Sequence, residues 1–332
     1  MKYIIDGHYD ILMDVAARRK KGEHQVIRRR YYPAFQKGGV SGIVASIFVD
    51  SQYLPYGALS VAMEQISALH CEIEETPDLL MLCTSADDFL RAAETGKIGF
   101  LLSFEGAEPV SSCLLLHGFY AAGVRGLGLA WSRRNAAADG CDFSGSLKKG
   151  GLTEFGRELV KEAEDLHMIL DLSHLSDEGV EDVLSITSCP VIASHSNSRA
   201  VAGSNRNLTD CQMREIASRG GTVGLNGCSL LTAGPGASPD QNGLTAHLDH
   251  MTEIMGEDHV AFGFDFCDSF FADDLSSSTD QMPERPFDIL SGAHEDLPAF
   301  LDYLRQHGYT ESHLAKLAGE NWLHTFRHIL KH

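Results

Sequence analysis

The chain has 332 residues, of which 43% are hydrophobic and 22% are charged, so it can bury a sizeable core. Its formal net charge is −19, and this excess of carboxylates argues against a nucleic-acid partner, whose phosphates would attract basic groups. We expect a cytoplasmic protein with no membrane association, because we find no secretion signal and no apolar run near the ~18 residues that span a bilayer.

Short apolar runs typical of buried strands alternate with amphipathic runs typical of helices. The strand-like runs cover residues 3–7, 42–50, 78–83, 98–105, 124–131, 168–174, 190–195, 222–227 and 259–265. The helix-like runs include residues 57–75, 153–167, 177–186, 209–220 and 244–256, and several begin with Thr or Asp, which suit an N-cap. Continuous apolar strands are typical of a parallel sheet covered on both faces. The alternation therefore predicts an α/β fold, and about eight such units favour a (β/α)8 TIM barrel.

We expect a single catalytic domain over residues 1–332, because nothing in the sequence resembles an interdomain linker. The most irregular stretch, residues 266–298, follows the last strand-like run. It fits a long loop at the C-terminal face of a barrel, where substrate-binding loops lie. Two further runs, residues 295–308 and 311–330, are predicted to form C-terminal helices that close the structure.

Five of the strand-like runs lead into residues that bind metals or transfer protons. These residues are His8, Asp10, Glu105, His174, His195 and Asp265. Taken singly, each has an ordinary explanation as a turn, capping or loop residue. Because the carboxyl ends of parallel barrel strands lie on one face, however, the six side chains should meet around one pocket. Their coincidence favours a shared functional site.

The residue types at these strand ends indicate a site for two divalent metal ions. Imidazole and carboxylate ligands suit zinc, with manganese as the alternative, whereas the eight scattered cysteines form no CxxC pair. His8 and Asp10 would hold one ion. His174 and His195 would hold the other, and Glu105 would bridge the two.

Such a site predicts hydrolysis. Two metal ions would lower the pKa of a bridging water toward ~7 and so provide a hydroxide nucleophile at neutral pH. Asp265 is not needed as a metal ligand in this arrangement. It would act as the catalytic general acid and base, taking the proton of the nucleophile and passing it to the leaving amine.

Several segments resemble signature segments of the membrane (renal) dipeptidase family within the amidohydrolase superfamily. They include "DGHYD", "SFEGAEP", "DLSHLSD", "PVIASHSNSRAV", "NRNLTD" and "HVAFGFDF", in the order found in the family. The resemblance implies a barrel with two zinc ions that cleaves dipeptides, often with a D-residue at the C-terminal position, and that forms a homodimer. It implies a soluble member of the bacterial type. By position, it also implies the five metal ligands and the catalytic Asp265 described above.

The resemblance further implies that Arg206 binds the C-terminal carboxylate of the substrate. A guanidinium suits this role because it offers a planar pair of donors. Arg199 lies close behind His195 in the sequence, and we expect it to support the loop that carries this ligand.

The sequence departs from the family at one position. Mammalian members carry a histidine there that is thought to steady the carbonyl oxygen of the substrate, and this chain has Trp131 or Ser132. We expect Trp131 to contact the substrate. Stabilisation of the oxyanion would then be weaker, or would come from Arg133, Asn135 or the metal ions alone.

Two other functions remain open from the sequence alone. A related amidohydrolase that acts on another small amide, such as an N-acyl-D-amino acid or a lactam, would share the metal ions but would not need Arg206. A catalytically inactive barrel that only binds metal would not need Asp265. The presence of both residues favours the dipeptidase.

Overall fold

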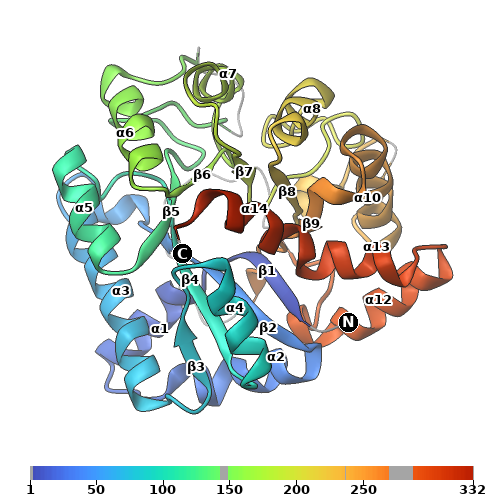
Figure 1. Cartoon of the computed structure of the whole chain (residues 1–332), viewed down its shortest axis with the longest axis horizontal. Coiled ribbons are helices and arrows are strands. Elements are labelled where there is room, and N and C mark those ends of the chain that lie inside the picture. The colour runs from blue at the N-terminus through green and yellow to red at the C-terminus, as the bar shows by residue number, and fades with distance from the viewer. Residues whose placement is uncertain (1–2, 143–148, 236, 269–286, 332) are drawn as a thin grey trace.

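Nine parallel strands form a single sheet in the computed structural model, which describes residues 3–142, 149–235, 237–268 and 287–331 (Figure 1). The strands are β1 (Ile4–Tyr9), β2 (Val40–Phe48), β3 (Leu80–Leu82), β4 (Ile98–Glu105), β5 (Val124–Gly128), β6 (Ile169–Asp171), β7 (Ile192–Ala193), β8 (Thr222–Leu225) and β9 (Val260–Phe262). Eight strands follow the order β1-β2-β4-β5-β6-β7-β8-β9, and β3 lies off this path, paired with β4. This nearly closed parallel barrel confirms the predicted (β/α)8 fold class.

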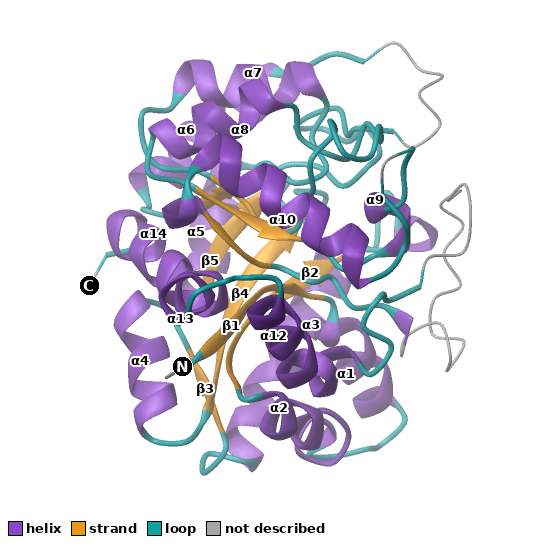
Figure 2. Ribbon diagram, turned by 90° about the vertical axis from the view of Figure 1, so that its right-hand side faces the viewer, coloured by secondary structure: helices purple, strands orange, loops and turns teal. Residues whose placement is uncertain are grey.

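The strands are buried because they are covered on both sides. Every residue of β1 and of β4 is buried, as expected when one face of a strand lines the barrel and the other packs against helices. Figure 2 shows the helices arranged around the strands. They are α1 (Ile11–Lys20), α2 (Tyr32–Gly38), α3 (Ala58–Glu75), α4 (Ala86–Glu94), α5 (Cys113–Ala121), α6 (Glu154–Asp165), α7 (Asp177–Ile186), α8 (Asp210–Ser218), α9 (Ser229–Thr232), α10 (Gln241–Met255), α12 (Leu297–Gln306), α13 (Glu311–Ala315) and α14 (Asn321–Ile329).

The predicted helices agree with the structure apart from their ends, except that the run 311–330 divides into α13, a π-helical turn over Lys316–Glu320 with a kink at Gly319, and α14. Thr153 and Thr209 cap α6 and α8 as expected, since each side chain accepts a hydrogen bond from a backbone N–H in the first turn. The helix predicted at 244–256 begins three residues earlier, because Asp240 accepts the N–H of Gly243 and caps the helix there. Of the predicted loop 266–298, residues 269–286 lie outside the described part of the chain, and its last residues form a 3-10 turn and the start of α12.

A buried carboxylate joins the first strand of the barrel to the segment that follows the last strand. Asp6 on β1 accepts the backbone N–H of Phe264 at 2.9 Å, and its other oxygen lies 2.8 Å from Nε2 of His294. The backbone N–H of Asp265 also donates to the carbonyl oxygen of His8 at 3.3 Å. These contacts hold the segment after β9 beside the end of β1, although the two are more than two hundred residues apart in the sequence.

Helix α14 fills the barrel from the end opposite the site. Its Trp322 packs with Ile5, Leu101 and Ile192, which lie on three different strands, and its indole N–H donates to the carbonyl oxygen of Phe262 at 2.8 Å. Figure 1 shows this dark red helix across the middle of the barrel. Within the described residues, no helix combines the length and apolar character that a membrane crossing requires.

Candidate metal centre

Three of the predicted ligands meet at the ends of β1 and β4. His8 lies on β1, Asp10 follows that strand directly, and Glu105 is the last residue of β4. Nε2 of His8 lies 3.6 Å from Oδ1 of Asp10 and 3.6 Å from Oε2 of Glu105. The three side chains therefore place one nitrogen and two carboxylate oxygens around a common point, which is a suitable arrangement for a divalent cation.

The other two predicted ligands face the second oxygen of Glu105. His174 and His195 follow the short strands β6 and β7. Oε1 of Glu105 lies 2.9 Å from Nε2 of His174 and 3.5 Å from Nε2 of His195, and the two imidazole nitrogens are 2.9 Å apart. Glu105 thus contacts a different ligand group with each of its oxygens, as a bridging carboxylate would.

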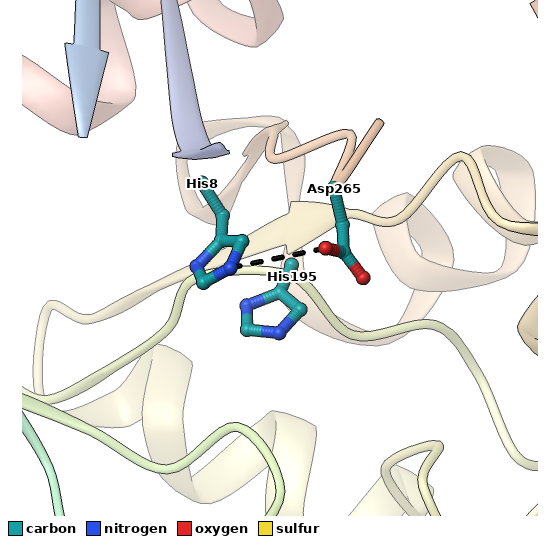
Figure 3. A group of neighbouring side chains, drawn as sticks. All are labelled: His8, His195 and Asp265. Atoms are coloured by element: carbon teal, nitrogen blue, oxygen red, sulfur yellow. Dashed lines mark ion pairs between the residues drawn. The ribbon is translucent and has the colours of Figure 1, made fainter. Parts of the chain in front are cut away.

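Asp265 lies at the edge of the two ligand groups. Its Oδ1 is 3.8 Å from Nε2 of His8, and the rings of His8 and His195 stack with their centroids 3.6 Å apart (Figure 3). Oδ2 of Asp265 accepts a hydrogen bond of 3.0 Å from the side-chain amide of Asn226. The structure therefore brings together all six residues that the strand ends predicted.

Two of the six residues have strained backbone conformations. His174 has a φ of +69° and Asp265 a φ of +57°, in the left-handed region that side chains with a Cβ rarely adopt. Such conformations persist when the surrounding structure requires them, and they are common at functional sites. Here they turn each side chain into the pocket three residues after the end of a strand.

Burial and crowding change the protonation of the site. Burial, reinforced by the neighbouring Asp10, raises the pKa of Glu105 to about 8, and burial raises the pKa of Asp265 to about 7. Burial alone would lower the pKa of His8, but the negative charges of Glu105 and Asp10 outweigh it and raise that pKa well above its usual value. Three carboxyl groups so close together would be stabilised by positive charge between them.

The donor atoms fit a pair of cations. Nε2 of His8 and Oδ1 of Asp10 are buried and have no hydrogen-bond partner among the described residues. Unpaired buried polar atoms are costly, and a cation would satisfy both of them. The set contains imidazole nitrogens and carboxylate oxygens and no sulfur, which suits zinc or manganese.

A further group of possible ligands lies beyond β9. It consists of Cys267, Asp268 and Asp288. The carboxylate of Asp288 accepts the backbone N–H groups of both Cys267 and Asp268, at 2.9 and 3.0 Å. These hydrogen bonds explain why the three side chains lie together, since Asp288 stabilises the backbone at Cys267 and Asp268.

The whole chain matches a known family. Residues 2–331 fit the family model described as membrane dipeptidase, peptidase family M19. The chain belongs to this family. The assignment makes the protein a metal-dependent hydrolase that acts on dipeptides, and it confirms the resemblance found in the sequence.

Individual relatives of this dipeptidase cover from 83% to 99% of the chain. An uncharacterised protein from the 5′ region of pqqA in Klebsiella pneumoniae is 33% identical over 83% of this chain and 98% of its own length. A metallopeptidase from Rhodobacter sphaeroides, solved with a phosphinate mimic of the dipeptide L-Ala-D-Ala, has a TM-score of 0.83 and 29% identity, with 98% and 99% of the two chains covered. The metallopeptidase called dipeptidase AC has a TM-score of 0.84 and 30% identity, with 99% and 98% covered.

Arg206 of this dipeptidase is a buried cation. Only 3% of its surface is exposed, and its guanidinium donates to Oγ of Ser196 at 2.7 Å and to the carbonyl oxygen of His195 at 2.8 Å. Its Nε has no partner, and no carboxylate of the described residues forms an ion pair with it. Arg199, by contrast, pairs with both oxygens of Asp177 at 2.7 and 2.8 Å.

Trp131 and Ser132, which the sequence analysis places at the position of the family histidine, both contact His174, a predicted metal ligand. The ring of Trp131 stacks on that of His174, with centroids 5.5 Å apart. Oγ of Ser132 lies 2.7 Å from Nδ1 of the same histidine. The expectation that Trp131 contacts the substrate remains a prediction. The geometry shows in addition that both residues orient the ring of His174.

The alternative oxyanion donors named from the sequence, Arg133 and Asn135, already contact other parts of the protein. The amide of Asn135 donates to the carbonyl oxygen of Leu129 at 2.8 Å, and its oxygen accepts two backbone N–H groups. Arg133 forms an ion pair with Glu108 at 3.0 Å and donates to the carbonyl oxygen of Val49. Both side chains therefore support the loop after β5.

The sequence did not predict the polar residues that hydrogen-bond to the predicted ligands and to Asp265. Ser46 donates to Oε2 of Glu105 at 3.0 Å, and the side-chain amide of Asn226 donates to Oδ2 of Asp265. Oγ of Ser194 lies 2.6 Å from Nδ1 of His195 and donates to Asp171. The only signal for these residues in the sequence is their position, since Ser194 precedes His195 and Asp171 lies three residues before His174.

Proposed function

We propose that this protein hydrolyses dipeptides with two divalent metal ions, and that it accepts a D-residue at the C-terminal position. The observation that carries the proposal is the pair of ligand groups that share Glu105. The Rhodobacter metallopeptidase that resembles this chain binds a mimic of L-Ala-D-Ala, which supports this choice of substrate. We further propose zinc as the metal and a homodimer as the assembly.

Each ligand would have a separate place in the metal centre. His8 and Asp10 would hold one ion, His174 and His195 the other, and Glu105 both. Ions bound there would act as Lewis acids and lower the pKa of a coordinated water. A metal centre would also compensate the carboxylates, whose mutual repulsion and burial otherwise favour protonation of Glu105.

Asp265 would be the general acid and base. Its pKa of about 7 lies near neutral pH, where a carboxyl group can both accept and release a proton. Asn226 donates to Oδ2 and thereby fixes the plane of the carboxyl group, so that Oδ1 faces the ligand groups. A barrel that only stored metal would not need such a group.

Arg206 would bind the free C-terminal carboxylate of the substrate. A buried guanidinium without an acidic partner has an unsatisfied charge, and a substrate carboxylate would supply the missing anion. This feature favours a dipeptidase over an amidohydrolase whose substrate has no free carboxylate.

The proposal is tested with purified protein and a panel of L-L, L-D and D-D dipeptides in the presence of Zn²⁺ or Mn²⁺. We expect cleavage of dipeptides with close to two metal ions per chain, and poor cleavage of the same peptides after C-terminal amidation. Full activity in metal-free protein would refute the metal mechanism. Equal cleavage of free and amidated peptides would favour a related amidohydrolase whose substrate, such as a lactam, has no free carboxylate.

A further inference from the structure

The two histidines of the second ligand group have different neighbours on their outer nitrogens. Nδ1 of His195 lies 2.6 Å from Oγ of Ser194, and Nδ1 of His174 lies 2.7 Å from Oγ of Ser132. A neutral imidazole carries its proton on one nitrogen and can bind a metal only through the other. The direction of each serine hydrogen bond therefore determines whether Nε2 is available to a metal ion.

The direction is fixed at His195 by Asp171. This carboxylate is buried, and its Oδ1 accepts the backbone N–H groups of Ser173 at 3.0 Å and Ser194 at 2.9 Å. Its Oδ2 accepts the hydroxyl proton of Ser194. The other hydroxyl near Ser194, on Ser173, lies 3.5 Å away and is a weaker acceptor than a carboxylate.

A serine hydroxyl has only one proton to donate. Since Ser194 donates it to Asp171, Oγ of Ser194 can only accept from His195. The proton of His195 must then be on Nδ1, and Nε2 presents a lone pair toward Glu105 and His174.

At His174, the direction of the serine hydrogen bond is not fixed in this way. Oγ of Ser132 lies 2.7 Å from Nδ1 of His174 and 3.2 Å from Sγ of Cys141, and either neighbour can donate or accept. No carboxylate of the described residues contacts Ser132. The two histidines thus differ in whether the serine beside each of them fixes its tautomer.

We propose that Asp171 and Ser194 are positioning residues that hold His195 in the tautomer with Nε2 free for metal binding. The inference deepens the proposed function, since it rests on His195 being a metal ligand. Hydrogen-bonded groups behind metal-binding histidines commonly change metal affinity by 10- to 100-fold.

Asp171→Asn is the decisive variant, because it keeps the shape of the side chain and reverses the hydrogen bonds. The two backbone N–H groups at Oδ1 require an oxygen there, so the amide NH₂ must face Ser194. Ser194 then accepts from the amide and donates to Nδ1 of His195. The proton of the imidazole moves to Nε2, where it blocks the metal.

Two readouts follow the tautomer separately from turnover. Chelator competition on the full chain should show that Asp171→Asn binds one of the two ions about 10- to 100-fold more weakly. In metal-free protein labelled with ¹⁵N-histidine, the His195 signals, identified by their loss in His195→Gln, should change from the Nδ1–H to the Nε2–H pattern. Ser194→Thr keeps the hydroxyl and should retain the wild-type pattern.

Ser132→Ala is the matched control, since it removes a buried hydroxyl from the other histidine. It should leave the His195 signals unchanged. Wild-type affinity together with an Nδ1–H pattern in folded Asp171→Asn would overturn the inference. If the wild-type protein cleaves no dipeptide and binds no pair of ions, the proposed function fails, whereas the tautomer in the metal-free protein still tests the hydrogen-bond direction.

Discussion

Replacement of Arg206 should weaken catalysis only for substrates that carry a free C-terminal carboxylate. Arg206→Gln keeps much of the volume of the side chain and one donor, so it perturbs packing less than alanine would. The variant removes the positive charge and the planar pair of donors. The test is therefore whether the loss of activity depends on the charge at the end of the substrate.

The expected size of the effect follows from the contacts of the guanidinium. Two of its N–H groups are used by Ser196 and His195, and the buried Nε–H is unpaired. A carboxylate that accepted Nε–H and one further N–H would gain two charge-assisted hydrogen bonds, each worth about 1.5–3 kcal/mol. Truncation of one partner in a buried charge pair costs about 2–5 kcal/mol, so kcat/KM should fall about 30- to 4,000-fold.

The assay compares kcat/KM for one dipeptide and its C-terminal amide in wild-type and variant proteins, with metal content measured for each. We expect amidation to lower activity of the wild type by about as much as Arg206→Gln does, and to have little additional effect in the variant. Arg199→Ala is a suitable control, because Arg199 lies in the same loop but is already paired with Asp177. It should not alter the ratio of the two substrates.

One result would refute the reasoning. If Arg206→Gln lowered activity equally for the free and amidated peptides while metal content stayed the same, Arg206 would not contact the carboxylate. Its burial would then serve the structure of the loop that contains His195, to whose carbonyl oxygen it donates.

Three further predictions concern the metal centre and the barrel. Asp265→Asn should keep both metal ions and lower kcat by about 10²- to 10⁴-fold, and an unchanged kcat would mean that another group moves the proton. Glu105 and Asp265, with pKa values raised to about 8 and about 7, ionise at lower pH in the unfolded chain. The unfolding free energy of chelator-treated protein should therefore fall from about pH 5 to about pH 8, and added Zn²⁺ should reverse the loss in denaturant titrations. Trp322→Ala should cost about 3–5 kcal/mol in the same titration, against less than about 0.5 kcal/mol for Tyr56→Ala, whose side chain is 97% exposed.

The convergence of the six candidate side chains could be predicted because the fold itself determines it. In a parallel barrel every strand delivers its last residue to the same face, so a pattern of strand ends already implies a site. Glu105 is the last residue of β4, and His8 lies near the end of β1. The strand-like run 78–83 shows the limit of this rule. It forms β3, which pairs with the first residues of β4 and lies off the barrel path, and pairing between strands is not visible in an apolar pattern.

The roles of Asp171, Ser194 and Asn226, which hydrogen-bond around the candidate site, could not be predicted. Serine, asparagine and aspartate near strand ends can take many structural roles. Asp171 could have capped a helix, and Ser194 could have been a loop residue. Their roles depend on which backbone N–H groups and imidazole nitrogens face them in space. Only the structure shows that Asp171 accepts hydrogen bonds from the backbone N–H groups of two residues and from one hydroxyl.

The replacement of the family histidine has a consequence for catalysis. Ser132 and Trp131 both contact His174, and Asn135 is used by the backbone of its own loop. None of these three side chains offers a cationic donor to the substrate. If these residues replace the family histidine as the sequence analysis expects, we predict that the carbonyl oxygen of the substrate is stabilised mainly by the proposed metal centre.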